Sequence, residues 1–186
     1  MTERRLVIFD VDGTLVDSQE DILASMQAAF TGQGLPVPAD AATKGIVGLS
    51  LPVAMQVLAP TVDAVRRDAM VVAYKAHYSA LRVAHGAKGS PLFPGARAAL
   101  DRLAALPGVQ LAVATGKSRR GLDGLIEVHG LEGVFVSTQV ADDHPSKPHP
   151  SMIHACLRET GVTAANAVMI GDTEFDIDMG HAAGIR

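Results

Sequence analysis

Residues 6–18 have the sequence LVIFDVDGTLVDS, and this stretch decides the fold more than any other. Its first four residues are continuously apolar, which is typical of a short strand buried on both faces of a parallel sheet. The apolar run ends at Asp10, and Gly13 allows the chain to turn sharply after Asp12. Side chains two apart on an extended chain leave on the same face, so Asp10 and Asp12 can address one point beyond the strand.

Two carboxylates at one point repel each other unless a cation lies beside them. The pair therefore indicates a metal-binding or catalytic role. An Asp-Gly pair also begins many hairpin turns, but the segment that follows Gly13 has a helical pattern and not that of a second alternating strand.

Further short apolar segments resemble this first strand, and helix-like stretches separate them. The expected strands cover residues 110–114, 134–136 and 167–170, and the expected helices cover residues 95–106, 118–128 and 150–160. This alternation predicts right-handed βαβ units in an α/β layer fold.

The alternation stops between about residues 16 and 94, where the sequence shows several helical signals and no convincing strand. We therefore expect a core of residues 1–16 and 92–186, with a helical insertion formed by residues 17–91. Ligands bind beyond the carboxyl ends of the strands in open α/β sheets, so an insertion after the first strand should lie over the binding edge. One long helix of the insertion, at about residues 62–84, has an apolar stripe that consists of Val65, Ala69, Val72, Ala76, Ala80 and Val83. Packing inside the insertion is expected for Met55, Met70, Tyr74 and Tyr78.

Composition restricts the class of protein. The chain has 186 residues, of which 48% are hydrophobic and 19% charged, as in a folded globular protein. Its net charge of −4, without any basic block, argues against a nucleic-acid or anionic-membrane partner. A single cysteine cannot form an internal disulfide, and no apolar run is long enough for a signal peptide or a membrane span. We expect a soluble, cytoplasmic protein with a small-molecule ligand.

Thr115 and Gly116 lie where the second strand ends and a helix begins. A hydroxyl and free backbone N–H groups at such a position can bind an anion, although they can equally be an ordinary helix cap. Gly116, Lys117 and Ser118 resemble the end of a nucleotide-binding loop, but Leu111 occupies the place of that loop's first glycine. A nucleotide-binding loop is therefore excluded.

Lys147 and Asp172 are the other polar groups near strand ends. Lys147 lies in a proline-rich loop before a helix. It can be a cation held in a fixed position, although a lysine is more usually a solvated surface residue. Asp172 ends an apolar strand, so its carboxylate needs a partner. Asp176 follows four residues later and can share a helical face with Asp172, or can stabilise the helix N-terminus through the helix dipole.

Four groups of residues follow the ends of successive strands: Asp10 with Asp12, Thr115 with Gly116, Lys147, and Asp172 with Asp176. Their order resembles the four motifs of the haloacid dehalogenase-like hydrolase superfamily. The segments FDVDGTLVDS and SKPHP are particularly similar to its phosphoglycolate phosphatase-like branch, and the resemblance covers residues 6–186. It implies a three-layer Rossmann-like parallel sheet with a helical cap of the C1 type inserted after the first strand. Family members normally continue into another strand after the position of Arg186, so we expect the sequence to be a fragment at this end.

The resemblance also implies a mechanism. Asp10 would attack phosphorus and become an aspartyl phosphate, and Asp12 would protonate the leaving oxygen and then activate water. The family's usual Mg²⁺ would bind Asp10, the backbone carbonyl of Asp12 and Asp172. The phosphoryl group would be bound by Thr115, Gly116 and Lys147, with Asp176 orienting Lys147 or a metal-bound water. The implied function is a Mg²⁺-dependent phosphatase of a small, phosphoglycolate-like phosphomonoester, a phosphorylated metabolite.

Two other functions stay open at this point. A phosphomutase similar to β-phosphoglucomutase would use the same motifs, although Thr14 is more typical of the phosphatases. A receiver-type signalling module also combines aspartates, a hydroxyl and a lysine, but it should be shorter and lack the helical insertion. Substrate choice would depend on the cap, where residues 45–51 should face the cleft and Lys44 could bind a substrate carboxylate.

Overall fold

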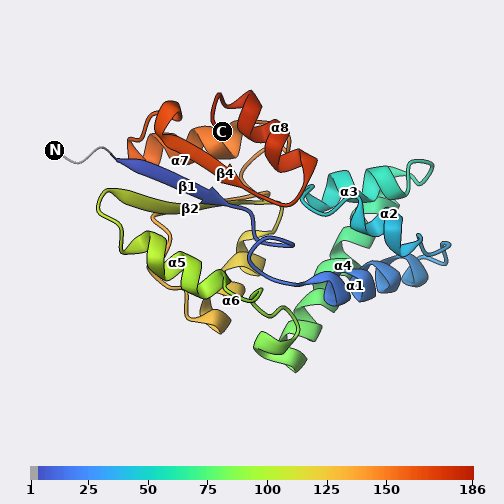
Figure 1. The fold of residues 1–186 in the computed structure, drawn as a ribbon. Coiled ribbons are helices and arrows are strands. Elements are labelled where there is room, and N and C mark those ends of the chain that lie inside the picture. The colour runs from blue at the N-terminus through green and yellow to red at the C-terminus, as the bar shows by residue number, and fades with distance from the viewer. Residues whose placement is uncertain (1–3) are drawn as a thin grey trace.

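A parallel sheet of four strands forms the centre of the computed structural model, which describes residues 4–186 (Figure 1). The first three residues of the predicted core range 1–16 lie outside the described residues. The sheet order is β3-β2-β1-β4, and Figure 1 labels β1 together with its two neighbours β2 and β4. The strands are β1 (Arg5–Phe9), β2 (Val109–Thr115), β3 (Ser137–Val140) and β4 (Ala167–Ile170).

Helices cover both faces of this sheet because successive side chains of β1 point to opposite sides. Leu6 and Ile8 pack in one apolar cluster with residues of α7 and α8, whereas Val7 and Phe9 pack in another with residues of α5 and α6. The three-layer α/β class is therefore confirmed. The core helices are α5 (Ala96–Ala104), α6 (Arg119–His129), α7 (Ser151–Thr160) and α8 (Glu174–Ala182), with short 3-10 turns η1 (Gly86–Lys88) and η2 (Ala164–Asn166).

A separate helical unit follows β1 and lies beyond the carboxyl ends of the strands (Figure 1). It has its own apolar cluster, which includes the buried side chains Met26, Phe30, Met55 and Met70. We call it the cap. Its helices are α1 (Gln19–Gly32), α2 (Asp40–Lys44), α3 (Leu51–Leu58) and α4 (Ala64–His85).

The two connections between cap and core run side by side. Val16 pairs with Leu92 in an antiparallel bridge, and the backbone N–H of Asp17 donates to the carbonyl of Pro91 at 2.9 Å. The apolar clusters beside the sheet contain no residue of the predicted insertion 17–91. On these grounds we propose that residues 17–91 and the rest of the chain are two folding units.

The third predicted strand is wrong in position. Residues 134–136 form a turn and an irregular segment, and Val136 is exposed, while β3 begins at Ser137. Two of the three buried side chains of β3 are polar: Gln139 Nε2 donates to Ser137 Oγ at 2.9 Å, and Ser137 Oγ donates to Glu159 at 2.6 Å. A strand whose buried side chains satisfy one another by hydrogen bonds does not show the apolar pattern on which the prediction depended.

The predicted apolar stripe of the long helix is exposed. Val65, Val72 and Val83 are 80%, 68% and 83% exposed, and the three alanines between them are also exposed. The opposite side of α4 packs instead, with Met70 fully buried and Tyr74 packed against the cap cluster. No helix among residues 4–186 combines the length and apolar character needed to cross a membrane.

Candidate active site

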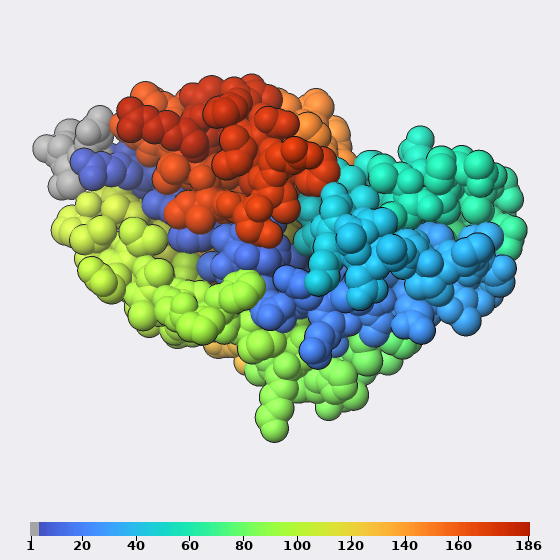
Figure 2. Space-filling model, turned by 45° about the vertical axis from the view of Figure 1, so that its right-hand side comes forward, coloured from blue at the N-terminus to red at the C-terminus, as the bar shows by residue number. Residues whose placement is uncertain are grey.

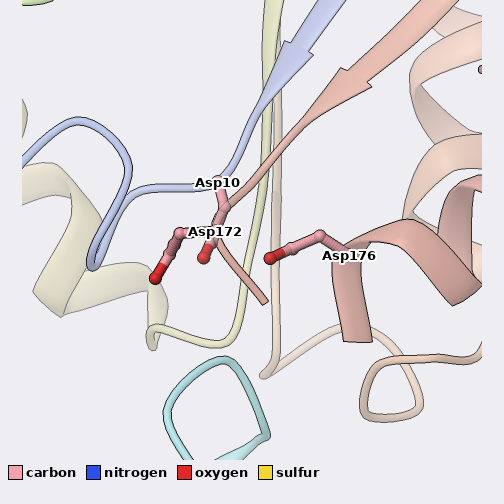
Figure 3. A group of neighbouring side chains, drawn as sticks. All are labelled: Asp10, Asp172 and Asp176. Atoms are coloured by element: carbon pink, nitrogen blue, oxygen red, sulfur yellow. The ribbon is translucent and has the colours of Figure 1, made fainter. Parts of the chain in front are cut away.

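Three carboxylates meet beyond the carboxyl ends of β1 and β4 (Figure 3). Asp10 directly follows β1, Asp172 lies in the loop after β4, and Asp176 lies in the first turn of α8. One oxygen of each lies within 4.8 Å of an oxygen of the other two. The topology thus places together acidic residues that are far apart in the sequence.

Asp10 is buried in an unusual environment. Its side chain is 1% exposed, and Lys147 Nζ lies 2.8 Å from its Oδ1. Neither Asp10 oxygen accepts a well-directed hydrogen bond from the described residues. Burial raises the pKa of Asp10 to about 6, against the opposing effect of the Lys147 ammonium. The carboxylate therefore has unused acceptor capacity and lies within reach of a cationic partner.

Lys147 is a fixed internal cation and not a surface residue. Its side chain is fully buried, and Nζ donates to Asp176 Oδ1 at 2.6 Å. Burial on its own lowers the pKa of Lys147, but Asp10 and Asp176 outweigh it and raise the pKa above the ordinary value. The other oxygen of Asp176 accepts from the Thr173 hydroxyl at 2.7 Å and from its backbone N–H at 3.2 Å, in the capping box that begins α8.

Two glycines allow these groups to approach the backbone. A Cβ on Gly13, whose φ is +87°, would lie 2.1 Å from Asp172 Oδ2. A Cβ on Gly171 would lie 2.2 Å from Asp176 Cγ. Any other residue at either position would displace a carboxylate of the site.

The donor set fits a small, hard cation such as Mg²⁺. Asp10 has two buried oxygens without a well-directed hydrogen bond, and Asp172 is exposed, with one oxygen accepting from Thr14 Oγ1 at 2.8 Å. Carboxylate oxygens are the ligands that Mg²⁺ prefers. Asp176 is already engaged by Lys147 and Thr173, which suits a supporting role better than a direct one.

Asp12 points away from this cluster and toward the cap. Its carboxylate accepts from Lys117 Nζ at 2.8 and 3.0 Å and from the hydroxyl of Ser18. Lys117 Nζ also donates to the Tyr78 hydroxyl at 3.1 Å and lies 4.8 Å from the centre of that ring. Although burial disfavours the ammonium, Asp12 and Tyr78 raise the pKa of Lys117 above its usual value.

Sequence reasoning missed the roles of Lys117, Ser18 and Tyr78. In the sequence, Lys117 stands out only as part of a pattern that resembles the end of a nucleotide-binding loop, and Tyr78 only as a packing residue of the cap. The contact between Lys117 and Asp12 joins residues 105 apart in the sequence, so no local pattern announces it. The one available signal is position: Lys117 directly follows the Thr-Gly pair at the carboxyl end of a strand next to β1.

Thr115 and Gly116 lie at the end of β2, with Thr115 buried and its Oγ1 accepting from the Lys117 backbone N–H at 3.3 Å. A Cβ on Gly116 would lie 2.5 Å from the carbonyl oxygen of Gly48 and 2.7 Å from that of Leu49. The predicted cap loop, residues 45–51, thus rests against the core at this glycine.

Other contacts also join cap and core. The Ser50 backbone N–H donates to Ser146 Oγ at 2.8 Å, and Gly48 lies against Thr173 and Phe175. In Figure 2 the cyan cap segment touches the red C-terminal part of the core.

A cleft of about 900 Å³ lies between cap and core. Asp10, Asp12, Thr115 and Gly116 open into it from the core side, and residues 46–49 line it from the cap side, as predicted for this loop. Lys44 is different: it is exposed at the end of α2 and does not line the cleft. Four of the predicted core residues lie around one point, namely Asp10, Lys147, Asp172 and Asp176. Asp12, Thr115 and Gly116 lie on the wall of the cleft into which Asp10 opens, and Lys44 lies outside it.

Comparisons with known proteins agree with this geometry. A family model described as haloacid dehalogenase-like hydrolase matches residues 7–186. The "Probable phosphatase IndB" of Dickeya dadantii is 37% identical over 97% of this chain and 78% of its own, and the phosphoglycolate phosphatase of Rhodospirillum rubrum is 32% identical over 97% and 77%. A haloacid dehalogenase-like family hydrolase from Streptococcus pneumoniae, 25% identical, superposes with a TM-score of 0.82 over 100% of this chain and 84% of that one.

Proposed function

The chain belongs to the haloacid dehalogenase-like hydrolase family and is a phosphatase, and we propose that it hydrolyses a small phosphomonoester through an aspartyl phosphate on Asp10. The observation that carries the proposal is the pairing of a buried carboxylate, open to a cleft and short of hydrogen bonds, with the buried Lys147. The proposed cofactor is Mg²⁺. The proposed ligand is a phosphorylated metabolite, and phosphoglycolate is the first compound to test because several relatives are named for it.

In the first step an oxygen of Asp10 attacks phosphorus, and the bond from phosphorus to the alcohol oxygen breaks. Asp12 gives its proton to that oxygen, so the alcohol leaves neutral. In the second step Asp12 takes a proton from water as the water attacks the aspartyl phosphate, which releases inorganic phosphate and restores Asp10.

Charge on the transferring phosphoryl oxygens needs compensation in both steps, because such a transition state spreads negative charge over three oxygens. We propose that the Lys147 ammonium, the Thr115 hydroxyl and the backbone N–H of Gly116 supply it. Mg²⁺ bound by Asp10, the Asp12 carbonyl and Asp172 would add positive charge on the same side. Asp176 would hold Lys147 in position through their 2.6 Å contact.

The proposed intermediate can be trapped on Asp10. We expect Asp12→Asn, incubated with Mg²⁺ and an aryl phosphate, to accumulate one added phosphate, because an aryl leaving group departs without a proton donor while hydrolysis of the aspartyl phosphate needs a base. Intact-mass spectrometry followed by peptide mapping measures the label and its position. Asp10→Asn should acquire no label, and chelation of Mg²⁺ should prevent labelling of Asp12→Asn.

A label on another residue, or labelling that survives exhaustive chelation, would contradict the proposed nucleophile or the proposed cofactor. Phosphate that leaves one sugar phosphate and reappears on another, without release to solution, would instead indicate the phosphomutase.

The proposal includes a cytoplasmic location, in keeping with the buried free thiol of Cys156.

A further inference from the structure

The wall of the cleft that does not touch the phosphoryl site is largely apolar. The apolar stripe of α4, which contributes nothing to the packed interior of the cap, continues along this wall through Val72, Ala76, Ala80 and Val83. On α1, Ile22 and Met26 line the same cleft. The exposed stripe of α4 and these apolar side chains of α1 thus line the same cleft as Asp10.

Each of the four cationic side chains that line the cleft among the described residues already has a polar contact, but only two of them are paired with a carboxylate. Of the cationic side chains that line the cleft, Lys117 is paired with Asp12, and Lys75 lies 3.7 Å from a carboxylate oxygen of Asp142. The guanidinium of Arg82 donates to the backbone carbonyl of Arg120 at 3.0 Å.

Arg120 is itself exposed at the edge of the cleft, where it donates to Ser79 Oγ at 3.3 Å. Lys44 lies outside the cleft. The cleft therefore has no buried and unpaired cation among the described residues that could bind a carboxylate on the alcohol part of the substrate. Beside the apolar wall, a carboxylate such as that of glycolate would meet only the half-buried Arg82 and the exposed Arg120 as cations without a carboxylate partner.

The cleft is also large for a two-carbon acid. It keeps a volume of about 900 Å³ although the cap touches the core at Gly116 and at Ser146 and reaches Lys117 through Tyr78. Pockets of about 300–1,000 Å³ normally enclose an entire drug-sized ligand. In the proposed mechanism the phosphoryl group would occupy only the end of the cleft near Asp10.

We propose that the natural substrate is a phosphomonoester of an alcohol with an extended apolar group, which lies along the stripe of α4 while its phosphate lies at Asp10. This inference rests on the proposed phosphatase function and adds the class of alcohol to it. Binding of the apolar group removes the side chains of this stripe from water. Their burial then contributes to the free energy of substrate binding, whereas without substrate they stay exposed.

A series of n-alkyl phosphates tests the proposal. Beyond ethyl, added methylenes hardly change leaving-group chemistry, so changes in kcat/KM report contacts with the alcohol. Each methylene should raise kcat/KM by about two- to fourfold until the chain reaches the end of the apolar wall, as expected for methylenes removed from water. Substrates are kept below their micelle concentration, phosphate release is measured, and phosphoglycolate is included for comparison. Hexyl phosphate should exceed phosphoglycolate by at least about tenfold in kcat/KM.

Two substitutions on the exposed side of α4 locate the effect. Ala76 lines the cleft and Val65 does not, yet both are exposed positions of the same helix. Ala76→Glu places a charge in the apolar wall and should reduce the ratio of hexyl to methyl phosphate kcat/KM by about tenfold or more. Val65→Glu should leave that ratio within about twofold of the unmodified protein. Circular dichroism checks that both variants are folded.

The outcomes separate this inference from the proposed function. Failure to release phosphate from any ester, p-nitrophenyl phosphate included, would overturn the phosphatase function itself. An active enzyme whose kcat/KM is flat along the alkyl series, or highest for phosphoglycolate, would overturn the apolar substrate alone. Equal effects of Ala76→Glu and Val65→Glu would show that the stripe of α4 does not bind the alcohol.

Discussion

At the scale of single residues, the contact between Lys117 and Asp12 gives Lys117 a role in the reaction. Lys117 Nζ holds both oxygens of Asp12 and is itself placed by the Tyr78 hydroxyl of the cap. A side chain that must first give and then take a proton has to be oriented toward the leaving oxygen. We therefore expect Lys117 to act as a positioning residue for Asp12.

Lys117→Ala should lower kcat by about 10- to 100-fold, the range expected when a hydrogen bond to a charged group is lost. The decrease should be larger for alkyl phosphates than for aryl phosphates, because only the alkyl leaving groups depend strongly on protonation by Asp12. Steady-state kinetics with one ester of each type measure both effects. Lys117→Arg keeps the charge and should recover part of the activity toward the alkyl ester.

Tyr78→Phe is the matched control, since it removes the hydroxyl that places Lys117 but retains the ammonium and the aromatic ring. Its effect should have the same direction as that of Lys117→Ala and a smaller size. If Lys117→Ala slowed alkyl and aryl esters equally, Lys117 would act on the phosphoryl group or on folding, and not through Asp12.

The site residues that sequence could predict are those that end apolar strands. Asp10, Thr115 and Asp172 each lie at the end of an apolar strand, and a parallel sheet brings such positions to one edge. Lys147 was harder to place because burial of a lysine depends on carboxylates from other elements. The pairing of Lys117 with Asp12 is wholly tertiary and could not be predicted from spacing.

At the scale of helices and strands, too, the sequence predicts what depends on a local pattern and misses what depends on tertiary contacts. β1 was predicted closely because both of its faces are buried in apolar surroundings after Arg5, and β4 because all four of its residues are apolar although Ile170 is exposed. β3 was misplaced because Ser137 and Gln139 are buried as a hydrogen-bonded pair, which no apolar pattern indicates. The long helix α4 was found, but its stripe was assigned to the interior, since periodicity shows which residues share a face and not what that face meets.

The contact between the cap loop and Gly116, which lies between β2 and α6, can be tested by comparison with a second glycine. A Cβ on Gly116 meets backbone carbonyls of the cap loop at 2.5 and 2.7 Å, whereas a Cβ on Gly124 of α6 meets the end of the Arg82 side chain at 2.4 Å. A flexible guanidinium can move aside, but the loop can yield only by moving the cap. Gly116→Ala should therefore lower kcat/KM by about 10- to 100-fold, as displacements near 1 Å at a reaction centre do.

Gly124→Ala should change kcat/KM by less than about threefold. Because Ala within a helix is favoured over Gly by about 1 kcal/mol, the Tm of the Gly124→Ala variant should not fall. Thermal unfolding and kinetics of both variants supply the comparison. Equal kinetic losses in the two variants would mean that the cap loop moves as freely as the Arg82 side chain, and that its contact with Gly116 does not set the geometry of the site.

At the scale of the whole molecule, cap and core have separate apolar interiors joined by two adjacent strands of chain. Reaction chemistry lies on the core, while most of the apolar cleft wall lies on the cap. Motion about the paired connections at Val16 and Leu92 would open or close the cleft without disturbing the sheet. A division of this kind separates the phosphoryl chemistry from the choice of alcohol.

Removal of the cap should therefore separate catalysis from selectivity. Residues 17–91 can be replaced by a short glycine linker, because Asp17 and Pro91 are hydrogen-bonded neighbours at 2.9 Å and the core clusters use no residue between them. The shortened protein should keep a cooperative thermal transition that Mg²⁺ shifts upward, since Asp10 and Asp172 remain. It should hydrolyse aryl phosphate slowly, because water is no longer excluded, and its kcat/KM should be flat along the alkyl series. A chain-length gradient that survived the deletion would place the apolar binding surface on the core, whereas a core that stayed unfolded with Mg²⁺ present would refute the proposed division into two folding units.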